Sequence, residues 1–488
     1  MANGNFWDIE IWSLILIFGV IGASVLFASI LKSKVAFLKR SLIPSSVLAG
    51  IILLVISTIV FYATGGANNG GKYLFELEFF STGQYSGMTV LEIITYHCLG
   101  FGFVAMAFRQ NGQKVTGKRA QEVLDSGVTT VSTYLLQAIL GIIATILFAL
   151  LGSTIWKGAG ILLPFGFGQG TGQALNYGSM YGSGEQAWGF ISIDEGRSFG
   201  LTVAALGFLA ACIGGVIYLN VCRKKGLITI QDGEETEKYT FEQIVGVNEI
   251  PMSGSVDKMS IQLSFVIGTY GVSYALMLGL SYLLPGMRAT IFGFNFLLGT
   301  LLAVLLKAII GGMNKKRLFK RRFINNFLMN RIGGFFFDFM IVAGIAAIRI
   351  DAIRNYWGVL LALGLIGMLA TFFYVNFICK KLFPDYRHQQ FLAWYGMLTG
   401  TASTGIILLR EIDSDFLSPA ADNLVYQNLP AIVLGLPIML LASYIYNGGP
   451  NAVYITLGIA TALFVLLQVV LFRRSIFKKK KTEQPAEQ

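Results

Sequence analysis

The sequence predicts an all-α integral membrane protein, and three observations support this fold class. Of the 488 residues, 55% are hydrophobic and only 13% are charged, a composition that soluble domains do not have. Apolar runs of about 20 residues, long enough for a helix to cross the hydrocarbon core, recur along almost the whole chain. Lysine and arginine concentrate in alternate connecting segments, which indicates a defined orientation of these helices. No room remains for a large soluble domain.

Eleven runs are long and apolar enough to be transmembrane helices. Two further segments, 158–178 and 391–411, are apolar but shorter or interrupted by glycine and polar residues, so we expect re-entrant hairpins there. The eleven predicted spans are 11–31, 43–62, 88–108, 128–151, 198–222, 259–284, 289–311, 332–350, 356–379, 425–446 and 453–472.

The distribution of basic residues tests this threading, because one wrong crossing would invert the charge asymmetry of every later loop. With the N-terminus outside and the C-terminus cytoplasmic, the inner segments contain 30 of the 37 lysines and arginines. The net charge of +11 therefore reflects orientation in the membrane, and no nucleic-acid-binding motif competes with that interpretation. We expect a multi-pass protein of the cytoplasmic membrane with the lipid bilayer as its surroundings.

The chain divides into two halves of opposite predicted orientation. Residues 1–222 and 259–446 each hold five spans and one hairpin, and the linker 223–258 is hydrophilic and acidic. Short echoes such as "GQGTGQA" and "GTASTGI" occur in the same order in both halves, which favours an inverted repeat. The linker is a solvated connection or, alternatively, a regulatory ligand site. Residues 447–488 add an extra transmembrane helix and a basic cytoplasmic tail.

The glycine-spaced hairpins are the candidate binding site. Unpaired backbone groups in hydrocarbon cost several kcal/mol each, so such segments must line a cavity or be covered by protein. Broken helices offer free N–H groups to an anionic substrate and free carbonyls to a cation, and tips from opposite faces would meet near the midplane. Tight packing of small residues is the alternative. The candidate substrate-binding residues are Gly168, Gln169, Gly170, Thr171, Gly172, Gln173, Asn176, Thr399, Gly400, Thr401, Ser403, Thr404 and Gly405.

Charged and titratable residues inside spans are candidates for ion coupling. Asp338 lies well inside the eighth span and His97 inside the third, so each is either an ion site or a structural polar contact. We also expect a sodium site near the hairpin tips. Glu92 is close to the outer end of its span, where we expect it to be hydrated. Four charged residues follow the second hairpin: Arg410, Glu411, Asp413 and Asp415. They could contact a substrate carboxylate or gate access to the site, or they could form an exposed loop in which they pair with one another.

Three motifs resemble the bacterial sodium/glutamate symporter family. "FLKRSLIPSSVLAG" is similar to that family's basic loop and proline before the second span, "GFGQGTGQALNYG" to its GGHGTGAAW-type hairpin, and "MLTGTASTGIILL" occupies the place of its second glycine-rich motif. Gln169 stands where the family motif has a histidine. The resemblance implies a ten-span inverted-repeat core, usually a homodimer, that imports an acidic amino acid with sodium in an elevator-like manner and needs no cofactor.

The expected function is therefore secondary active transport of a glutamate-like solute coupled to sodium. Two alternatives stay open, a sodium- or proton-coupled transporter of another small carboxylate and a passive channel, because re-entrant loops also build selectivity filters. We do not expect an enzyme. His97 and His388 fall in different halves, and the sequence has neither an HExxH nor a GxSxG motif.

Overall fold

The computed structural model describes residues 7–109, 117–228, 255–285, 288–315, 324–413 and 418–482. Every regular element within these ranges is a helix. Of these helices, 11 are long and apolar enough to cross a membrane, and each overlaps one predicted span. The all-helical, multi-pass character of the chain is therefore confirmed. Most of the predicted linker and Asp415 lie outside the described residues.

The chain forms two compact units, and each unit takes helices from both halves of the sequence. The first unit comprises Met1–Gln113, Thr171–Asn176 and Asp232–Asp351, and the second comprises Lys114–Gly170, Tyr177–Gln231 and Ala352–Gln488. Spans one to three and six to eight thus belong to the first unit, whereas both hairpin segments begin in the second. The division in space differs from the division of the sequence into consecutive halves.

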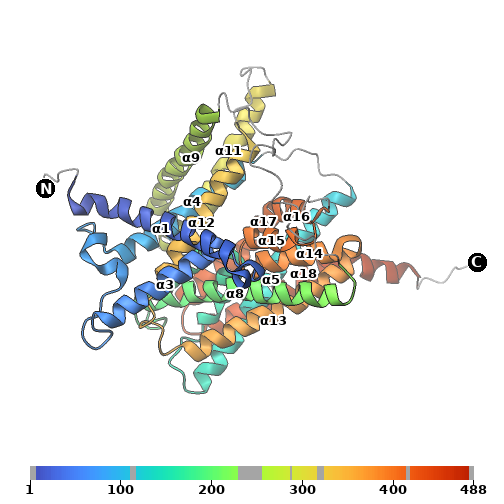
Figure 1. Ribbon diagram of the computed structural model, residues 1–488. Helices are drawn as coiled ribbons and strands as arrows, with labels where there is room; N and C mark the ends of the chain where they lie inside the picture. Colours follow the sequence, from blue (N-terminus) through green and yellow to red (C-terminus); the bar gives the residue numbers. More distant parts are fainter. Residues whose placement is uncertain are drawn as a thin grey trace, which may run out of the picture. The chain divides into compact units, whose positions relative to one another are not determined.

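In the first unit, α12 packs against α3 and α4, and α9 and α11 run side by side (Figure 1). Its long helices are α1 (Ile9–Lys34), α3 (Ser45–Ala63), α4 (Gly87–Phe108), α9 (Ser255–Leu283), α11 (Asn295–Lys315) and α12 (Asn326–Ala346), with the short α2 (Ala36–Arg40), η1 (Leu74–Glu76), η2 (Glu78–Phe80) and α10 (Arg288–Gly293) between them. Apolar side chains of α4, α9, α11 and α12, among them Phe108 and Val266, form a buried cluster in this unit.

In the second unit, α5 is the central helix and packs against α6, α13, α17 and α18. The helices of this unit are α5 (Lys118–Leu150), η3 (Ala159–Ile161), α6 (Leu162–Gln169), α8 (Ile193–Lys224), α13 (Trp357–Leu382), η6 (Pro384–Tyr386), α14 (Arg387–Thr399), α15 (Ala402–Arg410), α16 (Ala420–Tyr426), α17 (Asn428–Asn447) and α18 (Ala452–Thr482). The remaining helix, α7 (Thr171–Tyr181), contributes its first six residues to the first unit and the rest to the second.

Contacts between helix ends in the second unit agree with the alternating directions that the basic residues predict. The start of α5 and the ends of α8, α13 and α18 lie on one side of this unit. The contacts that place them there are Lys118 Nζ to Asp385 Oδ2 at 3.4 Å, Arg473 Nη1 to Asp125 Oδ1 at 2.9 Å and Tyr218 Oη to His388 Nδ1 at 2.8 Å. At the opposite end of the unit, the rings of Trp156, Tyr181 and Tyr446 lie 5.0 to 6.0 Å apart.

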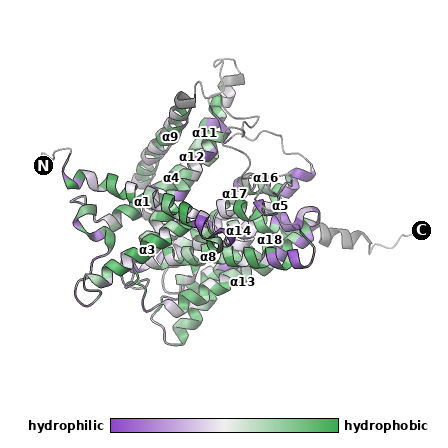
Figure 2. Cartoon of the chain, in the orientation of Figure 1, coloured by the Kyte–Doolittle hydropathy of each residue, from purple (hydrophilic) through white to green (hydrophobic). Residues whose placement is uncertain are grey.

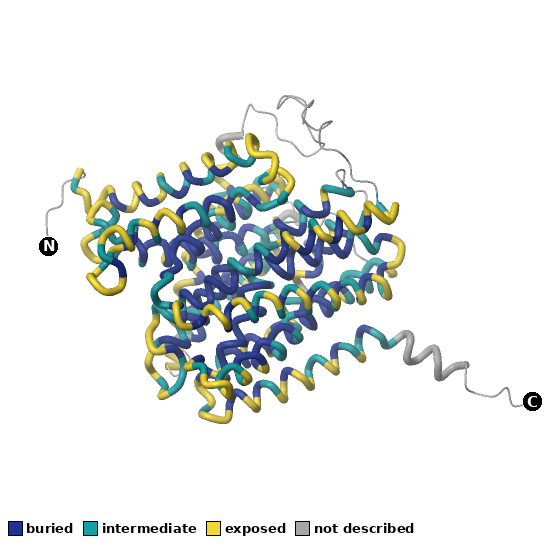
Figure 3. The backbone as a smooth tube through the Cα atoms, turned by 60° about the horizontal axis from the view of Figure 1, so that its bottom comes forward, coloured by how far each residue is buried: buried dark blue, intermediate teal, exposed yellow. Residues whose placement is uncertain are grey.

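The outer faces of the long helices are apolar, as a lipid-facing surface requires. Hydrophobic residues extend along the helices and hydrophilic ones concentrate toward their ends (Figure 2). Figure 3 shows exposed residues along much of the helix that leads to the C-terminus, α18, where Val465 and Leu466 are each 56% exposed. Exposed side chains of this kind are stable in a hydrocarbon solvent, which supports a lipid bilayer as the surroundings of the chain.

Candidate functional site

The first hairpin segment breaks at Gly170, between α6 and α7. This residue has a φ of +79° and a ψ of −169°, a conformation that only glycine adopts without strain. The rings of Phe165 and Tyr177 lie 4.3 Å apart although the two residues are twelve positions apart, which would separate them by about 18 Å in a continuous helix. Trp156 before α6 also touches Tyr181 at the end of α7, with ring centroids 5.0 Å apart. The chain therefore folds back on itself at Gly170.

The second hairpin segment breaks at Gly400 and Thr401, between α14 and α15. Here too the two helices fold back, because Gly405 of α15 packs directly against Gly396 of α14. The side chain of Thr401 caps α15 by accepting a hydrogen bond from the backbone N–H of Thr404. The sequence expectation of an interrupted helix in 158–178 and in 391–411 thus corresponds to two helical hairpins with breaks of one and two residues.

The C-terminal ends of α6 and α14 meet against α8 in the second unit. A Cβ atom on Gly207 of α8 would lie 2.5 Å from the carbonyl oxygen of Thr399 and 3.2 Å from the Cα atom of Phe167. Both helices end within two residues of these contacts, at Gln169 and Thr399. The last carbonyl groups of a helix have no partner inside it, so two sets of free acceptors gather at this point.

Two side chains of α5 bind these carbonyl groups. The hydroxyl of Tyr134 donates to the carbonyl of Gly168 at 3.1 Å. Three residues further along α5, Nε2 of Gln137 donates to the carbonyl of Leu398 at 3.0 Å and to the hydroxyl of Thr371 at 2.8 Å. Positions i and i+3 lie on the same face of a helix, so one face of α5 holds the ends of both hairpin helices.

The other amide atom of Gln137 is the most informative feature of this cluster. Gln137 is fully buried, and its Oε1 has no hydrogen-bond partner among the described residues. Together with the carbonyls of Gly168 and Leu398 and the hydroxyl of Thr371, it makes a set of uncharged oxygen atoms. We name this set the hairpin-end cluster. Among the described residues, no three His, Cys, Asp or Glu side chains gather into a metal-binding group.

Sequence reasoning did not find Tyr134, Gln137 or Thr371. One signal was available for Gln137, an amide in a long apolar helix, where an uncompensated polar group is costly. No such signal marks Thr371, because a threonine can satisfy its hydroxyl on its own helix.

The predicted residues after Gly170 lie in the first unit. Thr171 donates to the carbonyl of Met340 at 3.2 Å, and Asn176 donates to the carbonyl of Gly293 at 3.3 Å. Gln173 is fully buried, and neither atom of its amide has a hydrogen-bond partner among the described residues. Gly170 at the N-cap of α7 has no side chain to cap the helix. The other predicted residues of this hairpin differ in burial: Gly168 and Gln169 are half-buried, and Gly172 is buried.

The predicted residues of the second hairpin mostly bond within their own hairpin. The hydroxyl of Thr399 donates to the carbonyl of Tyr395 at 2.6 Å, one turn earlier in α14. Thr401 and Thr404 have their hydroxyl oxygens 3.3 Å apart. Thr399, Gly400, Thr404 and Gly405 are buried, Thr401 is half-buried and Ser403 is exposed. The structure thus brings Thr399 next to the first hairpin, while Ser403 lies on the surface.

The two predicted ion-coupling residues belong to the first unit, whereas the hairpin-end cluster belongs to the second. Asp338 of α12 is exposed and lies beside Ser46 of α3. His97 of α4 is exposed as well, and its Nδ1 lies 3.0 Å from the hydroxyl of Tyr270, which also accepts a hydrogen bond from Asn295. Each therefore has a polar neighbour that supports the structural alternative.

The expectation that Glu92 is hydrated is wrong. Glu92 is only 4% exposed, and its Oε1 lies 2.8 Å from Nη1 of Arg349. Arg349 also approaches Glu76 at 3.9 Å. A span end that appears close to water in the sequence is covered here by the segment between α3 and α4. In the charged group after the second hairpin, Asp413 accepts a hydrogen bond from the backbone of Ser418 at 3.1 Å.

Comparison with known proteins adds no relationship to this picture. Neither the models of known protein families nor the curated protein sequences give a match to this chain. The hairpin-end cluster, and the buried amide of Gln173 at the start of α7, are therefore interpreted from their own geometry.

Proposed function

We propose that the chain is a cation-coupled secondary transporter that imports a small anionic solute. An acidic amino acid is the first candidate solute, and sodium is the first candidate cation. The observation that carries the proposal is the hairpin-end cluster, in which two helix C-terminal ends meet beside the buried amide oxygen of Gln137.

The chemistry of this cluster suits a monovalent cation. Each helix C-terminus carries the equivalent of about half a negative charge, and two such ends repel one another unless a positive charge lies between them. Carbonyl, amide and hydroxyl oxygens replace the hydration shell of a hard cation, and carbonyls at broken helices of transporters bind sodium in this way. The oxygens that define the cluster are all uncharged, so a singly charged ion is favoured over a divalent one.

The start of α7 suits an anionic group. Its first N–H groups have no partner inside the helix, and the positive end of the helix dipole lies there. Because Gly170 supplies no capping side chain, these donors depend on another acceptor. The neighbouring amide of Gln173 can donate to a carboxylate through Nε2 and accept from an ammonium group through Oε1. An amino acid with an acidic side chain offers both kinds of group.

The composition of the two units supports an inverted repeat and alternating access. Each unit takes spans from both halves of the chain, three and three in the first unit and two and two in the second, which also contains the extra helix α18, the whole second hairpin and α6 of the first hairpin. Repeats of opposite orientation would produce such a division, because matching elements of the two halves associate. One unit that contains both hairpin ends could then move as a body, as an elevator-like mechanism needs.

Coupling to sodium supplies enough free energy for accumulation. One net positive charge that moves inward gains about 2.3 kcal/mol per 100 mV of membrane potential. A free energy of this size corresponds to more than a tenfold concentration ratio, because about 1.4 kcal/mol is one factor of ten.

The test is a flux assay with the purified chain in proteoliposomes. With sodium outside and a negative interior, radiolabelled glutamate should accumulate above its external concentration, and an ionophore that collapses the sodium gradient should abolish this accumulation. Counterflow with other acidic amino acids and dicarboxylates then ranks the solutes. Uptake that never exceeds equilibrium and ignores the sodium gradient would replace the transporter with a passive channel.

A further inference from the structure

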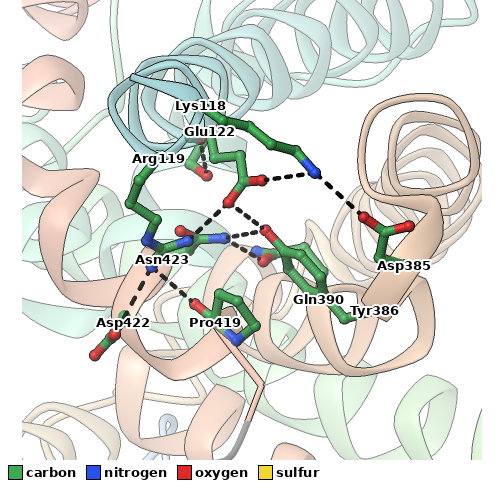
Figure 4. Close-up of polar contacts among 10 residues, drawn as sticks. Lys118, Arg119, Glu122, Asp385, Tyr386, Gln390, Pro419, Asp422 and Asn423 are labelled. Carbon is green, nitrogen blue, oxygen red and sulfur yellow. Dashed lines mark hydrogen bonds and ion pairs between the residues drawn. The ribbon is translucent and has the colours of Figure 1, made fainter. Parts of the chain in front are cut away.

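A second polar cluster lies at the start of α5, where that helix meets α14 and α16 (Figure 4). Glu122 accepts hydrogen bonds from Arg119 at 3.0 Å and from the hydroxyl of Tyr386 at 3.1 Å. Behind Tyr386, the amide of Asn423 donates to the Tyr386 oxygen at 3.1 Å and to Oε1 of Gln390 at 2.7 Å. Arg119 and Glu122 are partly exposed, whereas Asn423 and Gln390 are fully buried. The hydrogen bonds thus lead from the surface into the unit.

One turn deeper, Gln427 continues this line of polar contacts. Its Oε1 accepts from the hydroxyl of Thr130 and from Nε1 of Trp394, each at 2.9 Å. Its Nε2 lies 2.9 Å from the sulfur of Met397, the residue before Leu398 in the chain. Gln427, Thr130 and Trp394 are buried.

These two groups follow one another along three helices, joined by the backbone hydrogen bond from Gln427 to the carbonyl of Asn423, and together we call them the polar seam. The polar seam is defined by these side chains: Glu122 and Thr130 of α5, Tyr386 of η6, Gln390 and Trp394 of α14, Asn423 of α16, and Gln427 directly after α16. On α5 it begins at Glu122 and ends at Thr130, eight residues later, which corresponds to about 12 Å along the helix axis. Gln137 of the hairpin-end cluster follows two helical turns further along α5, and on α14 the contact of Gln427 with Met397 reaches the residue before Leu398. The seam therefore leads from the charged surface at the start of α5 toward the hairpin-end cluster.

Two buried atoms of the seam indicate more than polar packing. Oδ1 of Asn423 and Nε2 of Gln390 have no hydrogen-bond partner among the described residues. An unsatisfied buried acceptor or donor costs about 1 to 3 kcal/mol, so leucine in both places would be the cheaper way to join these helices. One free acceptor next to one free donor matches the bonding of water, which needs two to four polar partners in a buried site.

We propose that the polar seam is a hydrated path along which the coupling cation passes between the hairpin-end cluster and the aqueous phase at the start of α5. This inference rests on the proposed function, since it assumes that a cation binds at the cluster. Successive hydroxyl and amide groups replace part of the hydration shell of the ion, and the two atoms without protein partners bind the water molecules that move with it.

Cysteine accessibility tests the seam directly. In the full-length chain in membrane vesicles, Asn423→Cys should react with a small cationic methanethiosulfonate reagent at least tenfold faster than Leu424→Cys. Leu424 is the matched control, since it is the next residue of α16 and is only 3% exposed. Sodium should slow the reaction of Asn423→Cys. The wild type, whose four native cysteines are all buried, gives the background rate.

A second pair of variants covers the case in which a change in α16 prevents folding. Gln390→Cys and Leu392→Cys lie on α14 and are equally buried in the structure, so only a hydrated seam makes the first react faster. Equal rates within both pairs would overturn the seam. The flux assay separates this outcome from failure of the proposed function. If sodium-driven uptake occurs but both pairs react equally, the seam alone is refuted, whereas absence of sodium-driven uptake refutes the transporter and with it the role of the seam in cation passage.

Discussion

The two helical hairpins are alike at the end of their first helix and different at the start of their second. Both α6 and α14 end against the same face of α5, where Tyr134 and Gln137 bind their carbonyl groups. The return helix α7 begins at a glycine without a side chain, whereas α15 begins with a threonine that caps it. Equivalent C-terminal ends suit one shared cation, and the single uncapped N-terminus suits one anionic solute. The asymmetry assigns the two ligands to different parts of the hairpins.

The largest effect is expected at the break of the first hairpin. Gly170→Ala forces a side chain into a backbone conformation that costs about 1 to 3 kcal/mol outside glycine, and we expect it to abolish uptake. Gly400→Ala is the comparison in the second hairpin, where φ is −141°, and it should retain measurable uptake. Proteoliposome flux and detergent thermal melting of both variants measure this difference. Equal losses would remove the distinction between the two breaks.

The next effect concerns the shared cation. Gln137→Leu removes the free amide oxygen and the hydrogen bond to Leu398, and it should raise the sodium concentration for half-maximal binding at least tenfold, or by about 1.4 kcal/mol. Radioactive sodium binding to the purified chain without solute gives this value. Gln468→Leu is the matched control, because Gln468 is a glutamine of α18 whose amide donates to the hydroxyl of Tyr374 at 2.8 Å instead of to a hairpin end. An unchanged sodium titration would move the cation away from the hairpin-end cluster.

A third variant separates the anionic solute from the cation. Gln173→Leu removes the buried amide at the start of α7 and should raise the KM for the solute about tenfold, which is the size expected for a hydrogen bond to a charged group. Sodium binding in the absence of solute should stay at the wild-type value. A variant with wild-type KM would show that Gln173 does not contact the solute.

A smaller effect is expected at the capped helix of the second hairpin. Thr401→Ala removes the N-cap of α15 and should lower the free energy of unfolding by about 1 kcal/mol. The KM for the solute should change little, since we assign the solute to the start of α7 and not to that of α15. Thermal melting and uptake kinetics check the two parts separately. A strong rise in KM would assign solute binding to both hairpins.

The smallest effect is a pH dependence of stability, which we expect from His388 in the first helix of the second hairpin. His388 lies in the first turn of α14, bonded to Tyr218, and burial together with the neighbouring Arg387 lowers the pKa of its imidazole below the ordinary value of about 6.5. As the pH falls below that value, the unfolded chain binds a proton that the folded chain does not, so stability decreases until the folded pKa is reached. Melting temperatures of the wild type and His388→Gln between pH 7.5 and roughly 5 should diverge, with the wild type losing more. Parallel curves would contradict the lowered pKa.

Local patterns made the two breaks predictable. The segments 158–178 and 391–411 combine glycine with polar side chains inside apolar surroundings, and a helix in such a place either breaks or is covered. The residues that hold the broken ends were not predictable in this way. Gln137 and Leu398 are separated by 261 positions, and no local pattern in either segment identifies the other as its partner.

The extra C-terminal helix and Glu92 illustrate the same limit. Hydropathy predicted α18 as a span, but not that Arg473 near its end would bind Asp125 of α5 at 2.9 Å within the second unit. Distance from a span end predicted a hydrated Glu92, yet Arg349 and the segment containing Glu76 cover it. Burial depends on which segments pack over a residue, and that is a property of the whole fold.

The sequence by itself determined the number of long apolar helices and the two segments that contain the breaks, because hydrophobic length and glycine content act within one segment at a time. Only the tertiary structure decided that both halves share each compact unit, that α6 and α14 end against the same glycine of α8 and that Tyr134 and Gln137 of α5 bind these two ends. These features arise from packing between distant segments, whose free energies depend on shape and on hydrogen-bond geometry rather than on local composition.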